Sequence, residues 1–150
     1  VVQDTKLDRS EISVSSAGTF VDISGLSVAI TPSATSSKIL ILAFVNGSQN
    51  VGSAGGFFTL KRDSTEIFRG DAASSRQRAT GNLASYSNAY INGNTPVFLD
   101  SPSSTSELTY KVSVCSDGSS TTVYINRGSS NTDNASYIAG ASSIIAMEIA

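Results

Sequence analysis

The side chains that most often carry out catalysis or bind metal ions are scarce in this chain. The sequence contains no histidine and a single cysteine, Cys115. A Ser-His-Asp or Cys-His relay needs a base that titrates near neutral pH, and a zinc site needs several histidine or cysteine ligands. The composition excludes such relays and zinc sites. We expect Cys115 to be a buried structural thiol, and no disulfide can form within the chain.

The carboxylates leave one enzymatic alternative open. A pair of acidic side chains of the kind that glycosidases use has no reliable spacing in sequence. Most of the 12 acidic residues flank predicted turns, however, so we expect no catalytic site and no enzymatic activity. The best candidate for a calcium loop is Asn131-Thr132-Asp133-Asn134. It lacks the glycine and the final glutamate of the helix-loop-helix motif, which favours a turn and predicts no bound metal or cofactor.

Three other patterns are typical of binding sites, but each has a simpler interpretation. Arg69-Gly70-Asp71 spells a tripeptide that some integrin ligands display, and a strand end followed by a turn also explains it. The glycine-rich segment 52–56 has no Lys-Ser/Thr after it, so it is not a phosphate-binding loop. Aromatic side chains could line a sugar-binding groove, although packing in the core or across strands is favoured. The tyrosines are Tyr86, Tyr90, Tyr110, Tyr124 and Tyr137.

The overall composition is that of one domain with an unusually uncharged surface. The chain has 150 residues and a mass of 15.5 kDa, enough for one sizeable core. Charged residues make up 15%, against about 25% in an average domain. With a net charge of −2 and no basic patch, no nucleic-acid partner is expected. No apolar run is long enough to span a membrane, and the charged first eleven residues do not resemble a signal peptide. We expect synthesis in the cytoplasm, with no membrane partner and no small-molecule substrate.

Apolar residues recur mainly with a period of two, which is typical of half-buried strands. Glu107 to Cys115 shows this period best, and Thr121 to Asn126 is the next such segment. The dipeptide Asp117-Gly118 between them favours a tight turn, which predicts that the two segments form a hairpin. A second hairpin is predicted from Phe57 to Arg69, with its turn at Asp63-Ser64. Further strands are predicted at Val21 to Ile23, Leu26 to Thr31, Lys38 to Val45, Val97 to Asp100 and Ser142 to Ile149.

Two of these predicted strands raise the question of which face is buried. In Ser142 to Ile149 we expect Ile145, Met147 and Ile149 to face the core. Lys38 to Val45 is apolar on both faces, so either it is covered on both sides or one face meets another subunit. The pattern predicts an all-β, jelly-roll-like antiparallel β-sandwich in a single domain. Residues 1–9 are expected to form an N-terminal arm or edge strand, and residues 10–150 the sandwich.

Several stretches, in a particular order and spacing, carry a family resemblance. They are 19–32 (TFVDISGLSVAITP), 37–41 (SKILI), 60–65 (LKRDST), 99–102 (LDSP), 108–112 (LTYKV), 123–127 (VYINR) and 142–149 (SSIIAMEI). Together they resemble small structural proteins of tailed phages, notably phages of cyanobacteria and marine bacteria. These proteins are variously decoration or tail-fibre proteins, and the resemblance covers most of the chain from about Thr19 onward. It does not extend with any clarity to residues 72–82.

The resemblance implies a structural protein of the virion and offers no catalytic residues. Our first hypothesis is a capsid decoration (cement) protein, a homotrimer on the capsid surface that binds between major capsid protein subunits and stabilises the shell. The alternative is the receptor- or glycan-binding head of a tail fibre. The residues expected at an oligomer or capsid interface are Val1, Val2, Leu40, Leu42 and Phe44.

Overall fold

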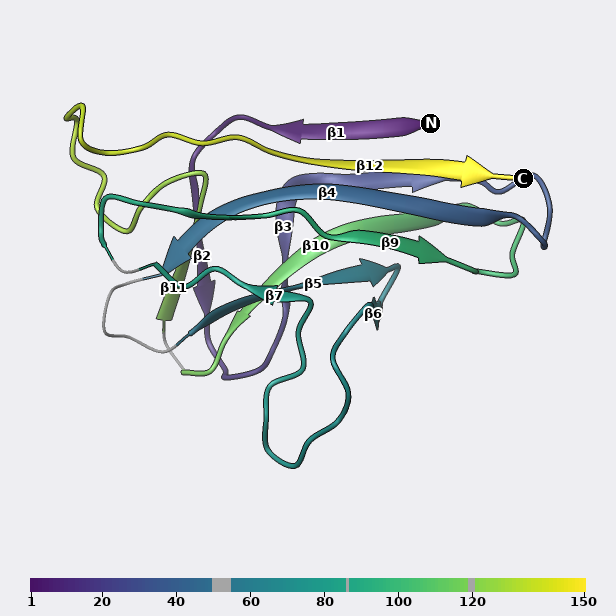
Figure 1. Cartoon of the computed structure of the whole chain (residues 1–150), viewed down its shortest axis with the longest axis horizontal. Coiled ribbons are helices and arrows are strands. Elements are labelled where there is room, and N and C mark those ends of the chain that lie inside the picture. Colours follow the sequence, from purple (N-terminus) through teal and green to yellow (C-terminus); the bar gives the residue numbers. More distant parts are fainter. Residues whose placement is uncertain (50–54, 86, 119–120) are drawn as a thin grey trace.

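Two antiparallel β-sheets pack face to face in this protein (Figure 1). The computed structural model describes residues 1–49, 55–85, 87–118 and 121–150. The strands in these residues are β1 (Val2–Lys6), β2 (Ser10–Val14), β3 (Val21–Ile30), β4 (Lys38–Gln49), β5 (Gly56–Arg62), β6 (Thr65–Ile67), β7 (Gly81–Asn82), β8 (Asn92–Asn94), β9 (Val97–Asp100), β10 (Leu108–Ser116), β11 (Thr121–Ile125) and β12 (Ser142–Ile149). Within them, no helix has the length and apolar character that a membrane crossing requires.

The first sheet is built around the long strand β4. Residues 38–44 of β4 pair with β12, and residues 47–49 pair with β11. On its other side, β4 pairs first with β9 and then with β8. Strand β1 continues the sheet beyond β12, and β2 continues it beyond β11. One half of the sheet therefore has the order β1-β12-β4-β9.

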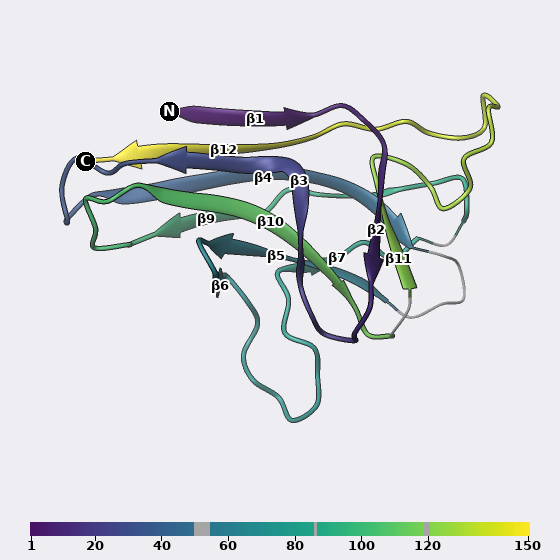
Figure 2. The same ribbon diagram turned by 180° about the vertical axis from the view of Figure 1, so that it is seen from behind.

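The second sheet has the order β3-β10-β5-β6, and β7 also pairs with β5. In the first sheet, strands from the first and second halves of the chain alternate, because β1, β2 and β4 pair with β8, β9, β11 and β12. The all-β antiparallel sandwich expected from the sequence is confirmed. Figures 1 and 2 show the two termini at one end of the sandwich and the loop between β11 and β12 at the other.

The core lies between the sheets and follows the period of two. In β10, Leu108, Tyr110, Val112 and Val114 are buried in one cluster, as the alternation predicted. The hairpin of β5 and β6 is also confirmed. Its turn residue Asp63 has φ of 55°, a conformation that aspartate tolerates better than most residues.

The two short strands predicted at 21–23 and 26–31 are a single strand, β3. Gly25 lies inside it with φ of 81°, and the register with β10 shifts between Lys111 and Ser113. A bulge of this kind bends a strand without ending it. The Ser-Gly pair therefore marks an irregularity within β3 and not a loop between two strands.

The hairpin predicted at Asp117-Gly118 is wrong. Strand β10 lies in the second sheet and β11 in the first, so the chain crosses between sheets here. Both edges of β10 are already paired, one with β3 and one with β5, which leaves no edge for β11. The dipeptide permits a sharp turn but does not determine which sheet the next strand joins. Residues 119–120 lie outside the described part of the chain.

The face assigned to the last strand is also wrong. In β12, Ile144 and Ala146 are fully buried, whereas Ile145, Met147 and Ile149 lie on the outer face. Because apolar residues occupy both faces of this strand, the period alone could not select the inner one. The small side chain of Ala146 fits the space opposite Ile41, its partner on β4.

Buried hydrogen bonds surround the point at which strand β4 changes its pairing partner from β12 to β11. The side-chain nitrogen of Asn126 donates to the carbonyl oxygens of Lys6 (2.8 Å) and Asp8 (3.0 Å). Its side-chain oxygen accepts from the Ser142 hydroxyl at 2.6 Å, and that hydroxyl accepts from the backbone N–H of Asn46 at 2.9 Å. This network ties four segments together and anchors both ends of the β11–β12 loop.

Candidate functional site

The outer face of the first sheet is apolar over three adjacent strands. In β4 the odd-numbered residues from Ile39 to Val45 are in the core, so Leu40, Leu42 and Phe44 point away from it. Residues that are directly paired in an antiparallel ladder share a face. The register therefore shows which side chains on the neighbouring strands lie beside these three.

Strands β9 and β12 complete this surface on either side of β4. Leu40 is paired with Leu99 and Met147, and Leu42 with Val97 and Ile145. The most exposed members are Val97 (54%), Leu99 (46%), Phe44 (43%) and Ile149 (43%). We call this surface the apolar face; it consists of Leu40, Leu42, Phe44, Val97, Leu99, Ile145, Met147 and Ile149.

Little charge accompanies the apolar face. Lys38, paired with Ile149, lies at its end, and Ser143 is paired with Phe44. Interface cores are depleted in charged residues and enriched in large apolar ones, whereas monomers rarely expose a large contiguous apolar patch. The apolar face shares with such interface cores its large apolar side chains, its low charge and its continuity over three strands.

The structure brings three of the five sequence-predicted interface residues together. Leu40, Leu42 and Phe44 share the apolar face. Val1 is 81% exposed and immediately precedes the edge strand β1. Val2 is paired with the buried Ala146 and packs on the core side of the sheet, so it lies away from the apolar face. The members on β12 were missed in the sequence because the outer face of this strand was taken for the inner one, and those on β9 were missed because no face was assigned to that strand.

The chemically reactive candidates from the sequence are spread through the fold. Burial, reinforced by the negative charges of Glu66 and Asp117, raises the pKa of the Cys115 thiol to about 12. Asp133 and its neighbours lie in the exposed β11–β12 loop. In the described ranges, no group of three His, Cys, Asp or Glu side chains is placed to hold a metal ion.

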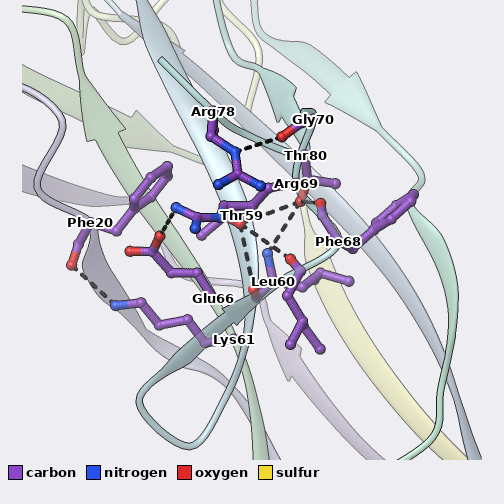
Figure 3. Close-up of polar contacts among 11 residues, drawn as sticks. Phe20, Thr59, Leu60, Lys61, Glu66, Phe68, Arg69, Gly70, Arg78 and Thr80 are labelled. Atoms are coloured by element: carbon purple, nitrogen blue, oxygen red, sulfur yellow. Dashed lines mark hydrogen bonds and ion pairs between the residues drawn. The ribbon is translucent and has the colours of Figure 1, made fainter. Parts of the chain in front are cut away.

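The Arg69-Gly70-Asp71 segment is held by contacts within its own hairpin and loop (Figure 3). The guanidinium of Arg69 forms an ion pair with Glu66, three residues earlier. Arg78 donates from Nε to the Gly70 carbonyl at 2.7 Å, and the Gly70 N–H donates to the Ala79 carbonyl at 3.3 Å. The arginine of the tripeptide is thus engaged at the base of the loop, an arrangement that serves to close the loop.

The described tyrosines have different environments, and Tyr86 lies outside the described residues. Tyr110 is fully buried and donates to Asp100 at 2.7 Å, so core packing is confirmed for it. Arg62 binds the same carboxylate oxygen at 2.7 Å. Tyr90 is exposed in the loop before β8, Tyr124 lies under a guanidinium, and Tyr137 lines a pocket.

That pocket is small and polar, and most of its lining comes from the β11–β12 loop. The loop lies at the end of the sandwich away from the termini (Figures 1 and 2). Its volume is about 140 Å³, and it is lined by Arg9, Arg127 and residues 130–134 and 137–139. The loop is held in place by backbone hydrogen bonds from Ser130 to Asn88 and from Ile138 to Ala89. A side chain at Gly128 would overlap the Asn88 carbonyl, so this close approach requires glycine.

Arg127 is the charged group at the centre of this region and is only 5% exposed. Its guanidinium carbon lies 4.6 Å from the centre of the Tyr124 ring, and Nη2 donates to Glu11 at 2.6 Å. Arg9 donates from Nη1 to the side-chain oxygen of Asn131 at 3.1 Å. Two arginines from distant parts of the sequence therefore line one pocket.

No protein-family model matches the chain, and no curated protein matches it. The apolar face and the polar pocket, together with the sequence, are therefore the features from which a function is inferred.

Proposed function

We propose that this chain is a structural protein of a virus particle, a capsid decoration protein that binds other protein surfaces. The observation that carries the proposal is the apolar face, a contiguous surface on three strands with one charged residue at its end. A surface of this kind on a rigid sandwich suits permanent contact with another protein. The low charge content and the resemblance to phage structural proteins favour the particle surface as the place of that contact.

In this proposal, the apolar face joins three copies of the chain, and the trimer binds between subunits of the major capsid protein. Each contact removes apolar area from water, which contributes roughly 25 cal/mol per Å² before the costs of association. Many symmetric copies then add their contributions across the shell. The role of the protein is mechanical, because it resists separation of neighbouring capsid subunits.

The test is to locate the protein in particles of the virus that encodes it. Tail-free capsids are purified, and the chain is quantified against the major capsid protein by mass spectrometry. The proposal expects a fixed ratio to the major capsid protein that persists through purification. Absence from tail-free capsids would rule out decoration of the shell.

The receptor- or glycan-binding head of a tail fibre is the second candidate, and the polar pocket favours it. Loops at the end of a rigid sandwich are common positions for recognition sites. This candidate expects the chain to be found with isolated tails and to bind host cell surfaces. The same fractionation therefore separates the two functions.

A further inference from the structure

Arg127 is the one charged side chain in the described part of the chain with buried nitrogens that lack a hydrogen-bond partner. Nη2 is paired with Glu11, whereas Nε and Nη1 have no partner among the described residues. Most buried polar groups in proteins are hydrogen-bonded, and an unsatisfied charged donor is more costly than an unsatisfied neutral one. A residue that lines a pocket and keeps two donors unused is suited to an acceptor that comes from outside the chain.

The charges around the pocket favour an anion as that acceptor. Arg9 places a second guanidinium in the lining, and Asp133 is the acidic residue there. Glu11 neutralises Arg127 only in part, because its side chain is 61% exposed and water weakens the pair. The buried guanidinium therefore keeps much of its attraction for a negative group. Its planar shape and fixed position over Tyr124 also suit the planar geometry of a carboxylate.

The rest of the lining is suited to hydroxyl groups. Residues 130–134 supply side-chain amides, hydroxyls and a carboxylate, which can both donate to and accept from a polyhydroxylated ligand. The ring of Tyr137 provides a flat, partly apolar wall. A pocket of about 140 Å³ has room for one small ring or the acidic end of a longer molecule. A monosaccharide that carries a carboxylate combines these features.

The geometry points to a binding site for a carboxylated sugar, with Arg127 as the residue that receives the carboxylate. The hydroxyls are held by Asn131 and its neighbours, and a hydrogen bond to Asn131 holds Arg9 beside them in the lining. The site uses no residue of the apolar face and lies at the other end of the sandwich, so it does not depend on self-association or on capsid binding. It gives a particle surface protein an affinity for acidic glycans.

The experiment is a titration of the full ¹⁵N-labelled chain with sodium D-glucuronate, followed by NMR. The signal of the Arg127 Nε–H group reports directly on the proposed contact. We expect it to shift in a saturable way, together with backbone signals of the β11–β12 loop. D-Glucose is the matched neutral probe, and inorganic phosphate is the probe for a general anion site.

Variants then assign the contact. Arg127→Lys keeps the charge but loses the planar fork, and we expect about tenfold weaker binding or more. Because this side chain is buried, Arg9→Gln and Asn131→Ala provide exposed substitutions that leave the core intact. Each should weaken glucuronate binding severalfold, whereas the control Arg76→Ala, an exposed arginine in another loop, should leave it unchanged.

Three results would overturn the inference. No saturable shift with glucuronate means that the pocket holds only water. Equal binding of glucose means that the carboxylate and Arg127 are not used, and equal binding of phosphate means that the site takes any small anion. None of these outcomes affects the capsid proposal, which is tested by the location of the protein in the particle.

Discussion

Replacing Phe44 with aspartate should convert the proposed trimer into monomers without unfolding the domain. Phe44 is the aromatic member of the apolar face and lies on the central strand β4, opposite Ser143. It is 43% exposed, so it contributes little to the core of a single copy. A charge at this position is solvated in the monomer and would be buried in the assembly.

The size of the effect follows from the exposed area. A phenylalanine side chain can bury about 200 Å², and the exposed 43% corresponds to roughly 85 Å². At about 25 cal/mol per Å² this is about 2 kcal/mol per copy, or roughly a 30-fold change in affinity for each contact. Three copies lose about 6 kcal/mol together, and desolvation of three carboxylates adds to the loss.

The assay is light scattering coupled to size-exclusion chromatography over a dilution series, with circular dichroism to verify folding. The matched control is Tyr90→Ala, which removes an exposed aromatic side chain outside the apolar face. We expect trimers for the wild type and this control, and folded monomers for Phe44→Asp. A wild-type chain that stays monomeric at high concentration, or soluble and unchanged trimers of Phe44→Asp, would refute the role given to the apolar face.

Four other predictions concern the fold itself. The high pKa of Cys115, which results from burial, predicts no reaction of the native protein with a thiol reagent at pH 8 and one reactive thiol after denaturation. Tyr110→Phe should lower the free energy of unfolding by about 2 kcal/mol in urea, since it removes a buried hydrogen bond to the charged Asp100. Burial alone would raise the pKa of Asp22, but hydrogen bonds from two lysines and a serine lower it by more than burial raises it. The pKa of Asp22 is therefore well below its usual value. The stability that Asp22 provides is therefore complete above about pH 4 and is lost as the pH falls further, and the stability difference from Asp22→Asn should shrink over the same acidic range. Asn126→Ala should lower the melting temperature more than Asn126→Gly, because both lose the buried hydrogen bonds but only alanine is strained at φ of 61°.

Most strands could be predicted from sequence because their residues alternate between core and solvent. Leu108 to Val114 is the clearest case. The prediction failed where alternation carries no information, as in β12, whose two faces are both apolar. It also failed at Asp117-Gly118, because a local turn preference cannot show that both edges of the preceding strand are already paired.

The two candidate sites differed in how much the sequence revealed. Leu40, Leu42 and Phe44 could be identified because Lys38 to Val45 is apolar on both faces, which is unusual for a strand with one side in water. The polar pocket had no such signal. Arg9 and Asn131 meet although 122 positions separate them, and only the fold brings them together. From the sequence, Asp133 and its neighbours could be read as calcium ligands or as residues of a turn. Neither interpretation indicated that an arginine lies beside them.

The topology of the sandwich also indicates how copies of the chain should associate. Sheets can join edge to edge, through free backbone groups, or face to face, through side chains. The free edge next to β12 is the short strand β1, whose outward-facing residues Gln3 and Thr5 are polar and which ends at Lys6. Polar outward residues and a short edge strand oppose extension of the sheet, while the apolar face favours contact through side chains. In a closed symmetric assembly, every copy buries its apolar face against the others, so no apolar face remains exposed and association stops at a defined number of copies. Head-to-tail pairing of strand edges would instead continue into a fibre. The proposed role in capsid decoration requires this limit, since many copies would have to remain soluble until they reach the capsid.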